Sequence, residues 1–254
     1  MKKCFTKRGD YHKIFQKSMQ KKMCIISLGG SLIVPNEIDW VYLKELKNLL
    51  TLYVDNGWKF ILIAGGGKTA RNYQDAAYGV DETLTDEDRD WLGIHSTRLN
   101  AQLLRTIFRD YAYPRINTNP HDLEDFSYCK ESIIIAAGYR PGCSTDYDAV
   151  LLAKYLDITS LVNLSNIDYV YTKDPKKYKD AEKVEKISWK DFRNIVGNVW
   201  SPGLNAPFDP VASRLAEEIN LEVAIMNGKD LKNFQNYLDG EIYKGTKVYS
   251  EIKK

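Results

Sequence analysis

The sequence predicts an α/β protein whose central sheet is mainly parallel and covered by helices. Five short apolar runs have the length of buried strands, and they lie at 23–28, 59–64, 132–138, 161–164 and 222–226. Helical patterns separate most of these runs, and alternation of strand and helix favours parallel strands joined by crossover connections. The 254 residues, 44% hydrophobic and 28% charged, suit a globular chain of one large domain or two small ones.

The first part of the chain supplies two strand–helix units. The first strand runs directly into Gly29-Gly30-Ser31. A helix is predicted at 40–56, because apolar residues recur there at helical spacing and Gly57 provides a stop. The second strand leads into Gly65-Gly66-Gly67, and a polar-faced helix is expected at 68–78.

The middle of the chain adds a long helix and a polar loop. The acidic stretch 81–90 reads as a loop or helix start before a long helix at 91–111. The apolar strand at 132–138 leads into the loop 139–146, which is expected to cap a helix at 147–157.

The last part of the chain continues the same alternation. The charged stretch 173–186 contains Pro175 and predicts a surface excursion. The remaining elements are expected as a helix at 188–196, a Pro/Gly-rich loop at 200–207, and helices at 210–220 and 230–238 around the last strand. A soft division near residue 160 separates two lobes of one sheet.

Charge is distributed unevenly along the chain. Residues 1–22 carry eight Lys or Arg and one Asp, whereas the remainder carries 28 basic and 33 acidic residues. The basic character therefore belongs to a tail, interpreted as a solvated or oligomer-contacting extension, and does not indicate nucleic-acid binding. The tail lacks the apolar core of a secretory signal, and no apolar run reaches bilayer length.

Cysteine and histidine usage argues against a zinc site. The four cysteines show no C-x-x-C spacing, and only three histidines are present. Cys24 and Cys129 lie in or beside apolar segments and are expected to pack as small hydrophobic residues. A reducing, cytoplasmic compartment is the expectation.

Glycine-rich turns follow three of the apolar strands, at 29–31, 65–67 and 138–142. Backbone N–H groups at such turns and at helix N-termini attract phosphate, and strand ends at one edge of a parallel sheet form a ligand crevice. Gly67-Lys68-Thr69 nearly completes a P-loop, but Leu62 stands where its leading glycine belongs. The three turns predict an extended polyphosphate-like ligand, with unrelated tight turns as the alternative.

Four aspartates near predicted strand ends or helix starts suit a metal–nucleotide complex, namely Asp146, Asp168, Asp174 and Asp209. Mg²⁺ prefers one or two carboxylates together with phosphate oxygens and water. Each aspartate has helix capping or a turn as its alternative, and for Asp146 capping is at least as good an interpretation. Tyr171 is either a base-stacking or a buried aromatic residue, and Asp90 either binds ribose hydroxyls or caps a helix.

Five motifs, in their order along the chain, resemble those of uridylate kinases in the amino acid kinase superfamily, particularly the archaeal type. They are Leu28-Gly-Gly-Ser31, Gly65-Gly-Gly-Lys-Thr-Ala-Arg71, Asp90-Trp-Leu-Gly-Ile-His-Ser-Thr-Arg-Leu-Asn-Ala101, Gly142-Cys-Ser-Thr-Asp146 and Ser165-Asn-Ile-Asp-Tyr-Val-Tyr-Thr-Lys-Asp-Pro175. The resemblance extends from Met23 to the last strand.

The resemblance implies a three-layer α/β/α sandwich that transfers a phosphoryl group from ATP, carried with Mg²⁺, to UMP. It implies a basic extension at 1–22 and a kinase domain at 23–254, with an acceptor-binding part at 23–160 and an ATP-binding part at 161–254. It also implies a cytoplasmic homo-oligomer, with a hexamer favoured, that has small-molecule substrates and neither nucleic-acid nor membrane partners.

Site residues carried over by position fall into three groups. The catalytic set is Lys68, Arg71, Asp146 and Asp209. The ATP set is Gly30, Ser31, Gly67, Arg71, Ser165, Asn166, Tyr171 and Asp174, with Tyr171 near adenine and Mg²⁺ near Asp174. The UMP set is Gly66, Asp90, Gly138, Tyr139, Arg140, Pro141, Gly142, Cys143, Ser144 and Thr145.

Two positions depart from the family pattern. Ser27 stands where many superfamily members have a lysine on the first strand, and Tyr169 stands where the family's Asp-Gly-Val segment has glycine. If that second position needs a positive φ, tyrosine is costly and the ATP loop must shift. The alternatives are therefore a kinase with another small phosphate or carboxylate acceptor, and a nucleotide-binding or storage protein without phosphoryl transfer. Arg71 and its neighbours disfavour an isopentenyl phosphate kinase, in which the second glycine motif leads to a histidine.

Overall fold

The computed structural model describes residues 22–122, 129–201 and 206–251. The predicted basic extension at 1–22, except for Lys22, and part of the predicted loop at 200–207 lie outside the described residues.

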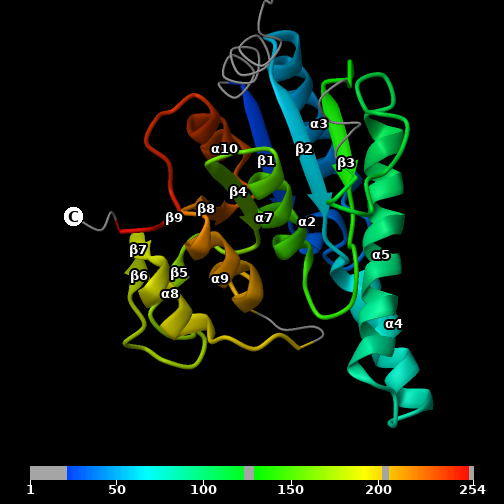
Figure 1. Cartoon of the computed structure of the whole chain (residues 1–254), viewed down its shortest axis with the longest axis vertical. Helices are drawn as coiled ribbons and strands as arrows, with labels where there is room; N and C mark the ends of the chain where they lie inside the picture. The colour runs from blue at the N-terminus through cyan, green and yellow to red at the C-terminus, as the bar shows by residue number, and fades with distance from the viewer. Residues whose placement is uncertain (1–21, 123–128, 202–205, 252–254) are drawn as a thin grey trace, which may run out of the picture.

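A seven-stranded sheet runs through the middle of the molecule (Figure 1). Its order is β3 (Ile133–Ala136), β2 (Lys59–Ala64), β1 (Met23–Leu28), β4 (Ser160–Ser165), β8 (Glu222–Asn227), β9 (Thr246–Tyr249) and β7 (Lys186–Ser188). All neighbouring pairs are parallel except β8 and β9. A separate antiparallel ribbon pairs β5 (Val170–Tyr171) with β6 (Lys183–Val184). The predicted parallel sheet is confirmed.

Helices cover both faces of the sheet, giving three layers. One face is covered by α3 (Trp40–Asp55), α5 (Asp86–Ile107) and α10 (Leu231–Leu238), and the other by α7 (Thr145–Tyr155), α8 (Trp189–Val196) and α9 (Pro210–Glu218). In Figure 1, α3 lies behind the strands and α7 and α9 lie in front. The remaining described helices are the one-turn α2 (Gly30–Ile33) and α4 (Gly67–Val80). The predicted α/β/α sandwich is confirmed.

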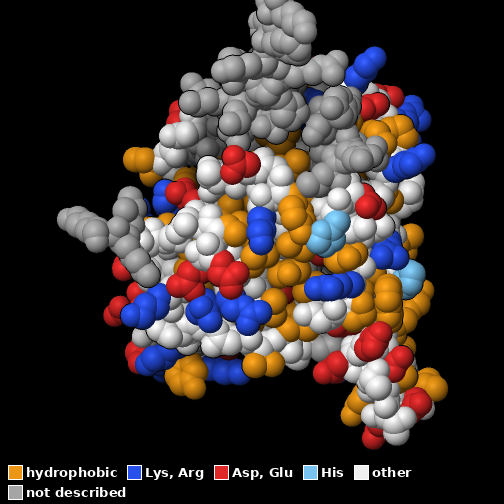
Figure 2. Space-filling model, in the orientation of Figure 1, with side chains coloured by type: hydrophobic (Ala, Val, Ile, Leu, Met, Phe, Trp, Pro, Cys, Tyr) orange, Lys and Arg blue, Asp and Glu red, His pale blue; other side chains and the backbone are white. Residues whose placement is uncertain are grey.

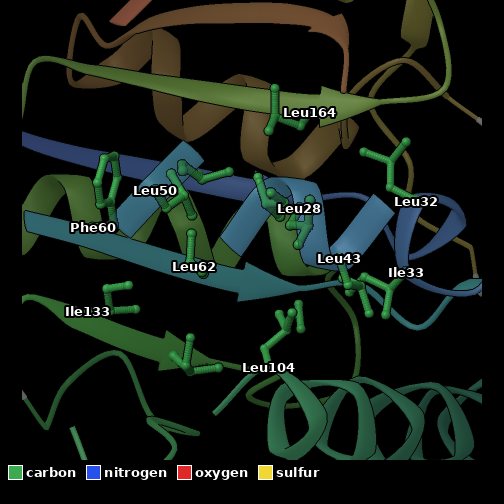
Figure 3. Close-up of a cluster of buried hydrophobic side chains, with 14 of the residues drawn as sticks. Leu28, Leu32, Ile33, Leu43, Leu50, Phe60, Leu62, Leu104, Ile133 and Leu164 are labelled. Carbon is green, nitrogen blue, oxygen red and sulfur yellow. The ribbon is translucent and has the colours of Figure 1, made fainter. Parts of the chain in front are cut away.

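Alternation along each strand builds two hydrophobic cores. On β1, Ile26 and Leu28 join the core beneath α3, whereas Ile25 joins the core on the other face. Figure 3 shows part of the first core, with Leu28 and Leu62 of the sheet facing the α3 residues Leu43 and Leu50. Successive strand residues point to opposite faces of a sheet, so a continuous apolar run is needed where both faces are covered.

Two helices begin earlier than the ranges expected for them, because their capping side chains lie further upstream. The long helix begins at Asp86 rather than 91, since Thr85 and Asp88 form a capping box. The helix expected at 147–157 begins at Thr145, because the Ser144 side chain accepts a hydrogen bond from the Asp146 backbone. Asp90 and Asp146 are therefore inside helices, and neither is the capping residue.

The C-terminal part contains strands that the sequence pattern did not indicate. β9 pairs with both β8 and β7, and its four residues alternate between buried and intermediate exposure, as the period of a strand requires. The charged stretch expected as a surface excursion also contributes β6, whose partner β5 lies ten or more residues earlier.

The α4–α5 hairpin projects beyond the sheet layers (Figure 1). The turn and the start of α5 carry the exposed acidic residues Asp81, Glu82, Asp86 and Glu87. Figure 2 shows a group of red acidic side chains at the lower right, where the hairpin projects. Acidic groups in the first turn of α5 interact favourably with the partial positive charge of its N-terminus. The predicted acidic stretch is thus the turn of a hairpin and the beginning of α5.

Strand order creates a crevice between β1 and β4. The chain proceeds from β1 outward to β2 and β3, then returns to place β4 on the opposite side of β1. Open parallel sheets bind ligands at such a reversal, outside the C-terminal ends of the strands. The backbone N–H of Gly29 bonds to Leu164 O at 2.8 Å, and that of Gly65 bonds to Leu28 O at 2.9 Å, so three strand ends are joined at this point.

Glycines allow these strand ends to approach one another. A Cβ added to Gly30 collides with the backbone of Gly67 and Gly65, and a Cβ added to Gly67 collides with the backbone of Gly30. Gly67 also has φ +64°, in the left-handed region that favours glycine. The interlocked backbone of these glycines is possible only without side chains.

We expect Gly30→Ala to lower the free energy of unfolding by about 3 kcal/mol, because the clash is with backbone that cannot rotate away. Gly79→Ala is the matched control, since its added Cβ has no neighbour within 4 Å and lies in helix α4. The control is expected to be neutral or to stabilise by about 0.5 kcal/mol. Urea unfolding of both variants checks this, and equal effects would contradict the interlock.

Candidate active site

A cleft of about 630 Å³ opens at the C-terminal ends of the central strands. Most of the predicted site residues line it, namely Gly30, Ser31, Gly66, Gly67, Arg71, Asp90, Gly138, Cys143, Ser144, Thr145, Asp146, Ser165 and Asn166. They come from α2, the turn between β2 and α4, α4, α5, the segment between β3 and α7, α7, the end of β4 and the position after it. Segments far apart in the sequence therefore meet at the predicted sheet edge.

Other predicted residues lie outside the lining of this cleft, namely Lys68, Tyr139, Arg140, Pro141, Gly142, Tyr171, Asp174 and Asp209. Tyr171 belongs to the β5–β6 ribbon. Asp174 accepts a hydrogen bond from the Lys176 backbone and lies 3.9 Å from the Lys177 ammonium. These two residues of the predicted ATP set are not brought to the phosphate cradle.

The glycine cradle at 65–67 is held from α5. The buried side chain of Asn100 donates to Gly65 O at 2.8 Å and to Gly66 O at 3.1 Å. With these carbonyls turned toward α5, the start of α4 faces the cleft, where a helix N-terminus favours an anion. Arg71 lines the cleft from the first turns of α4 and is the only Lys or Arg side chain among the described lining residues.

One face of α5 forms a wall of the cleft. Asp90, Gly93, Ile94 and Thr97 all line it, at the spacing of successive helical turns. Asp90 is only 8% exposed, and burial raises the pKa of its carboxyl group, while hydrogen bonds from Gly142 and Trp200 oppose that shift. A carboxylate inside the cleft can accept hydrogen bonds from hydroxyl groups of a ligand.

The same helix anchors the loop that follows β3. Gly138 N donates to Thr97 Oγ1 at 2.9 Å, and Gly142 N donates to Asp90 Oδ2 at 2.7 Å. The Arg98 guanidinium donates to the carbonyls of Gly138 and Tyr139 at 3.2 to 3.3 Å. Residues 138–142, predicted as a ligand loop, are thus positioned by polar side chains of α5.

Asp146 lies at the centre of a hydrogen-bond network at the base of the cleft. Its Oδ1 accepts from Ser27 Oγ at 2.7 Å and from Asn163 Nδ2 at 2.8 Å, and its Oδ2 accepts from Asp209 N at 3.2 Å. Burial raises the pKa of Asp146 to about 6, and the nearby Asp209 charge acts in the same direction. Ser27, the departure from the family's lysine, is therefore a hydrogen-bond partner of a cleft carboxylate.

Asp209 joins the cleft to α9 without lining it. Its Oδ1 caps the helix by accepting from the Val211 and Ala212 backbones, and its Oδ2 accepts from Ser144 N at 2.9 Å. The carboxylate is 3% exposed. Its geometry suits a residue that positions Ser144 and the start of α7.

Asp148 is a buried carboxylate that the sequence interpretation missed. It is 1% exposed, and its Oδ2 accepts from Tyr139 N at 3.0 Å, while no partner for Oδ1 is found within the described residues. Burial raises the pKa of Asp148 to about 8, and the charges of Asp209 and Asp146 add to the shift. The available signal was an acidic residue immediately before the apolar run 149–153 of α7.

Ser27, Asn163, Asn100 and Trp200 were also outside the predicted site set. Ser27 is a polar residue on the otherwise apolar strand β1, Asn163 lies between the buried apolar residues Val162 and Leu164 of β4, and Asn100 interrupts the apolar face of α5. Polar positions on buried faces were the available signal for these three. Trp200 is the first residue of the predicted Pro/Gly-rich loop at 200–207, a pattern that gave no signal for a site residue.

Tyr169 adopts an ordinary backbone conformation. Among the described residues the non-glycine positions with positive φ are Asp157 and Asn220, so the glycine-like conformation is not used at 169. Its ring lies 4.9 Å from the Lys183 ammonium, across the β5–β6 ribbon. The tyrosine is therefore accommodated without the backbone cost considered from the sequence.

Three further sequence expectations concern cysteines, metals and membranes. Cys24, Cys129 and Cys143 have free thiols, and burial raises the pKa of Cys24 and Cys143 to about 12. Within 22–122, 129–201 and 206–251, no three His, Cys, Asp or Glu side chains are arranged to hold a metal ion. In the same ranges no helix combines the length and apolar character needed to cross a bilayer.

Known proteins show the same architecture. The model of the amino acid kinase family matches residues 22–227. A uridylate kinase of Pyrococcus abyssi is 34% identical over 227 residues, covering 88% of this chain and 98% of that protein. A uridylate kinase of Methanocaldococcus jannaschii is 32% identical over 228 residues, covering 87% and 99%. The crystal structure of uridylate kinase from Archaeoglobus fulgidus has a TM-score of 0.74 at 28% identity, covering 89% of this chain and 99% of that one.

A three-layer sandwich with a phosphate cradle at the reversal of its strand order defines a phosphate-binding α/β protein. The chain belongs to the amino acid kinase family, in the group that contains the archaeal uridylate kinases.

We expect Asp148 to make stability depend on pH. Its folded-state pKa of about 8 lies above the unfolded value of about 3.9, so its stabilising contribution is complete below pH 4 and is lost as pH rises through 8. Relative to Asp148→Asn, the wild-type free energy of unfolding should fall with rising pH, by at most about 1.4 kcal/mol per unit. Urea unfolding of both proteins between pH 5 and 9 measures this difference, and parallel pH profiles would contradict it.

Proposed function

We propose that this protein transfers the γ-phosphoryl group of ATP to UMP, forming ADP and UDP. The observation that carries the proposal is the two-sided cleft. On one side are Asp90 and the loop at 138–145, on the other are Ser165 and Asn166, and between them lie Gly30, Gly67 and Arg71. The relatives in the same family group are uridylate kinases, and they match almost along their entire length.

The acceptor is proposed to bind on the α5 side. Asp90 accepts hydrogen bonds from the ribose, Gly66 faces the nucleotide, and the loop 138–145 surrounds the uridine and its phosphate. The loop is supported by Thr97 and Arg98, which bond to its backbone. This support favours a preformed acceptor subsite, because less conformational entropy is lost when the nucleotide binds.

The donor is proposed to bind from the β4 side, with Gly30, Ser31 and Gly67 at the transferring phosphates. Ser165 and Asn166 belong to this side of the cleft. Tyr171 and Asp174 are kept as proposed contacts for the distal part of ATP, since they lie beyond the cradle. Lys68 is proposed to contribute positive charge near the phosphates, together with Arg71.

The chemistry needs positioning and charge neutralisation more than covalent participation by the protein. An oxygen of the acceptor phosphate attacks the γ-phosphorus in line, and the bond from that phosphorus to the β–γ bridging oxygen breaks. Backbone donors and the N-terminus of α4 face the negative charge, and Arg71 can grip a phosphate in bidentate fashion. Asp146 and Asp209 organise the base of the cleft. Asp146 accepts hydrogen bonds from Ser27 and Asn163, and Asp209 accepts one from Ser144 N.

The cleft contains oxygen ligands that fit Mg²⁺. Asn163 Oδ1 is buried without a partner among the described residues, and the Asp146 carboxylate lies beside the same side chain. Hard oxygen atoms from one or two residues, with phosphate and water, suit Mg²⁺. Asp146 and Asn163 would hold the ion, which when bound with ATP supplies neutralisation of phosphate charge.

We also propose the division of the chain that the family resemblance implies: a basic extension at 1–22, an acceptor-binding part at about 23–160 and an ATP-binding part at about 161–254. The position of the cleft between β1 and β4 supports this division. A cytoplasmic homo-oligomer, with a hexamer favoured, is proposed on the same resemblance.

Incubation of the purified protein with ATP, Mg²⁺ and separate nucleoside monophosphates tests the function. We expect UDP from UMP, at a higher kcat/KM than products from CMP, AMP or GMP. Turnover of another acceptor without any UDP would replace the UMP assignment. Nucleotide binding without turnover of any acceptor would favour the storage or binding class.

Asp90→Ala is expected to raise KM for UMP by about tenfold, because the acceptor loses a hydrogen bond to a charged group. KM for ATP should stay within about twofold, since Asp90 is on the acceptor side. Asp86→Ala is the matched control, because Asp86 lies on the same helix with a largely exposed side chain outside the cleft. Equal losses for UMP and ATP would rule out a specific ribose role.

A further inference from the structure

Trp200 reaches the carboxylate of Asp90 from a segment that follows α8. Its indole Nε1 donates to Asp90 Oδ2 at 3.3 Å. The same oxygen accepts from Gly142 N at 2.7 Å. Three segments far apart in the sequence, namely α5, the loop after β3 and the segment after α8, therefore converge on one buried oxygen atom.

The indole is also part of the cleft wall. Trp200 is partly exposed and lines the cleft together with Ala206 and Pro207. A tryptophan kept partly open to solvent inside a polar cleft presents both a large apolar face and a hydrogen-bond donor. A nucleoside presents the complementary pair of features, a flat base and sugar hydroxyl groups.

We propose that Trp200 contacts the acceptor nucleoside and determines how well it binds. This inference rests on the proposed function and deepens it, because it assigns a residue of the acceptor subsite outside the motifs of the family resemblance. Trp200 packs against the nucleoside and holds Asp90 oriented toward the sugar. The aromatic ring and the indole N–H group contribute separately to binding of the acceptor.

Because Trp200 bonds to Asp90, we assign it to the acceptor side of the cleft rather than to the donor side. Asp90 shares its α5 face with Gly93, Ile94 and Thr97, and it holds Gly142 of the loop that is anchored to this helix. Ser165 and Asn166, on the other side of the cleft, lie at the end of β4 and directly after it. A change at Trp200 should therefore alter acceptor kinetics and leave donor kinetics intact.

The kinetic test uses two substitutions that separate ring from donor. Trp200→Phe keeps an aromatic ring and removes the N–H group, and we expect it to raise KM for UMP about threefold. Trp200→Ala removes both and is expected to raise KM for UMP about tenfold or more. For both variants kcat should remain within about twofold and KM for ATP unchanged.

Tryptophan fluorescence supplies a readout that a merely structural role would not move. UMP added without ATP should change the emission of the wild-type protein, and the change should disappear in Trp200→Phe. Trp40→Phe is the matched control, because Trp40 is 68% exposed at the start of α3 and is not part of the cleft. Trp40→Phe should retain both the emission change and wild-type kinetics.

Defined outcomes overturn the proposal. An unchanged KM for UMP in Trp200→Ala, an equal rise in KM for ATP, or a full emission change in Trp200→Phe would each do so. If the protein turns over another nucleoside monophosphate instead of UMP, the proposed function fails, and the same measurements are made with that acceptor. If no nucleoside monophosphate changes the emission of the wild type, the role of Trp200 is refuted whatever activity is measured.

Discussion

The site depends on the close approach of backbone at the ends of β1 and β2. Gly30 faces Gly65 and Gly67 at distances that leave no room for a Cβ on either side. Hydrogen bonds from Gly29 to Leu164 and from Gly65 to Leu28 extend the contact to β4, so one packing constraint aligns three strand ends. The cleft lies at this junction because the strand order reverses there, and the same constraint places the start of α4 against it.

A network of polar contacts joins β1 and β4 to the helices α7 and α9 at the base of the cleft. Ser27 and Asn163, from neighbouring strands, bond to Asp146, and Asp209 links Asp146 to Ser144 and to α9. With serine where many superfamily members have lysine, the Asp146 carboxylate is held by neutral donors rather than by a fixed cation. Burial raises the pKa of Asp146, the charge of Asp209 acts in the same direction, and the hydrogen bonds from Ser27 and Asn163 oppose the shift.

Much of the fold could be predicted, because short apolar runs indicate the buried strands and apolar residues at helical spacing indicate the helices between them. The cradles at 29–31 and 65–67 could also be located, since glycine after a buried strand has few structural explanations. β9 could not be found in this way, because its four residues become a strand only through pairing with β8 and β7. Trp200 could not be identified, because its partner Asp90 is distant in the sequence and its immediate neighbours indicate no such contact. Asp148 does precede a buried apolar run, but the groups that set its environment, Tyr139 N and the carboxylates of Asp146 and Asp209, are brought to it by the fold.

The charged side chains of the cleft do not match the charge of the two nucleotides that it is proposed to bind. Two nucleotides bring several phosphate groups, whereas the described lining offers one guanidinium, Arg71, and two carboxylates, Asp90 and Asp146. Side chains of the lining alone therefore do not neutralise the phosphates. The backbone donors of the glycine cradle and the N-terminus of α4 carry no net charge, and a divalent ion bound with ATP would supply further neutralisation. The spacing of the glycines thus matters electrostatically as well as sterically, because it decides how many backbone N–H groups reach the site where charge accumulates.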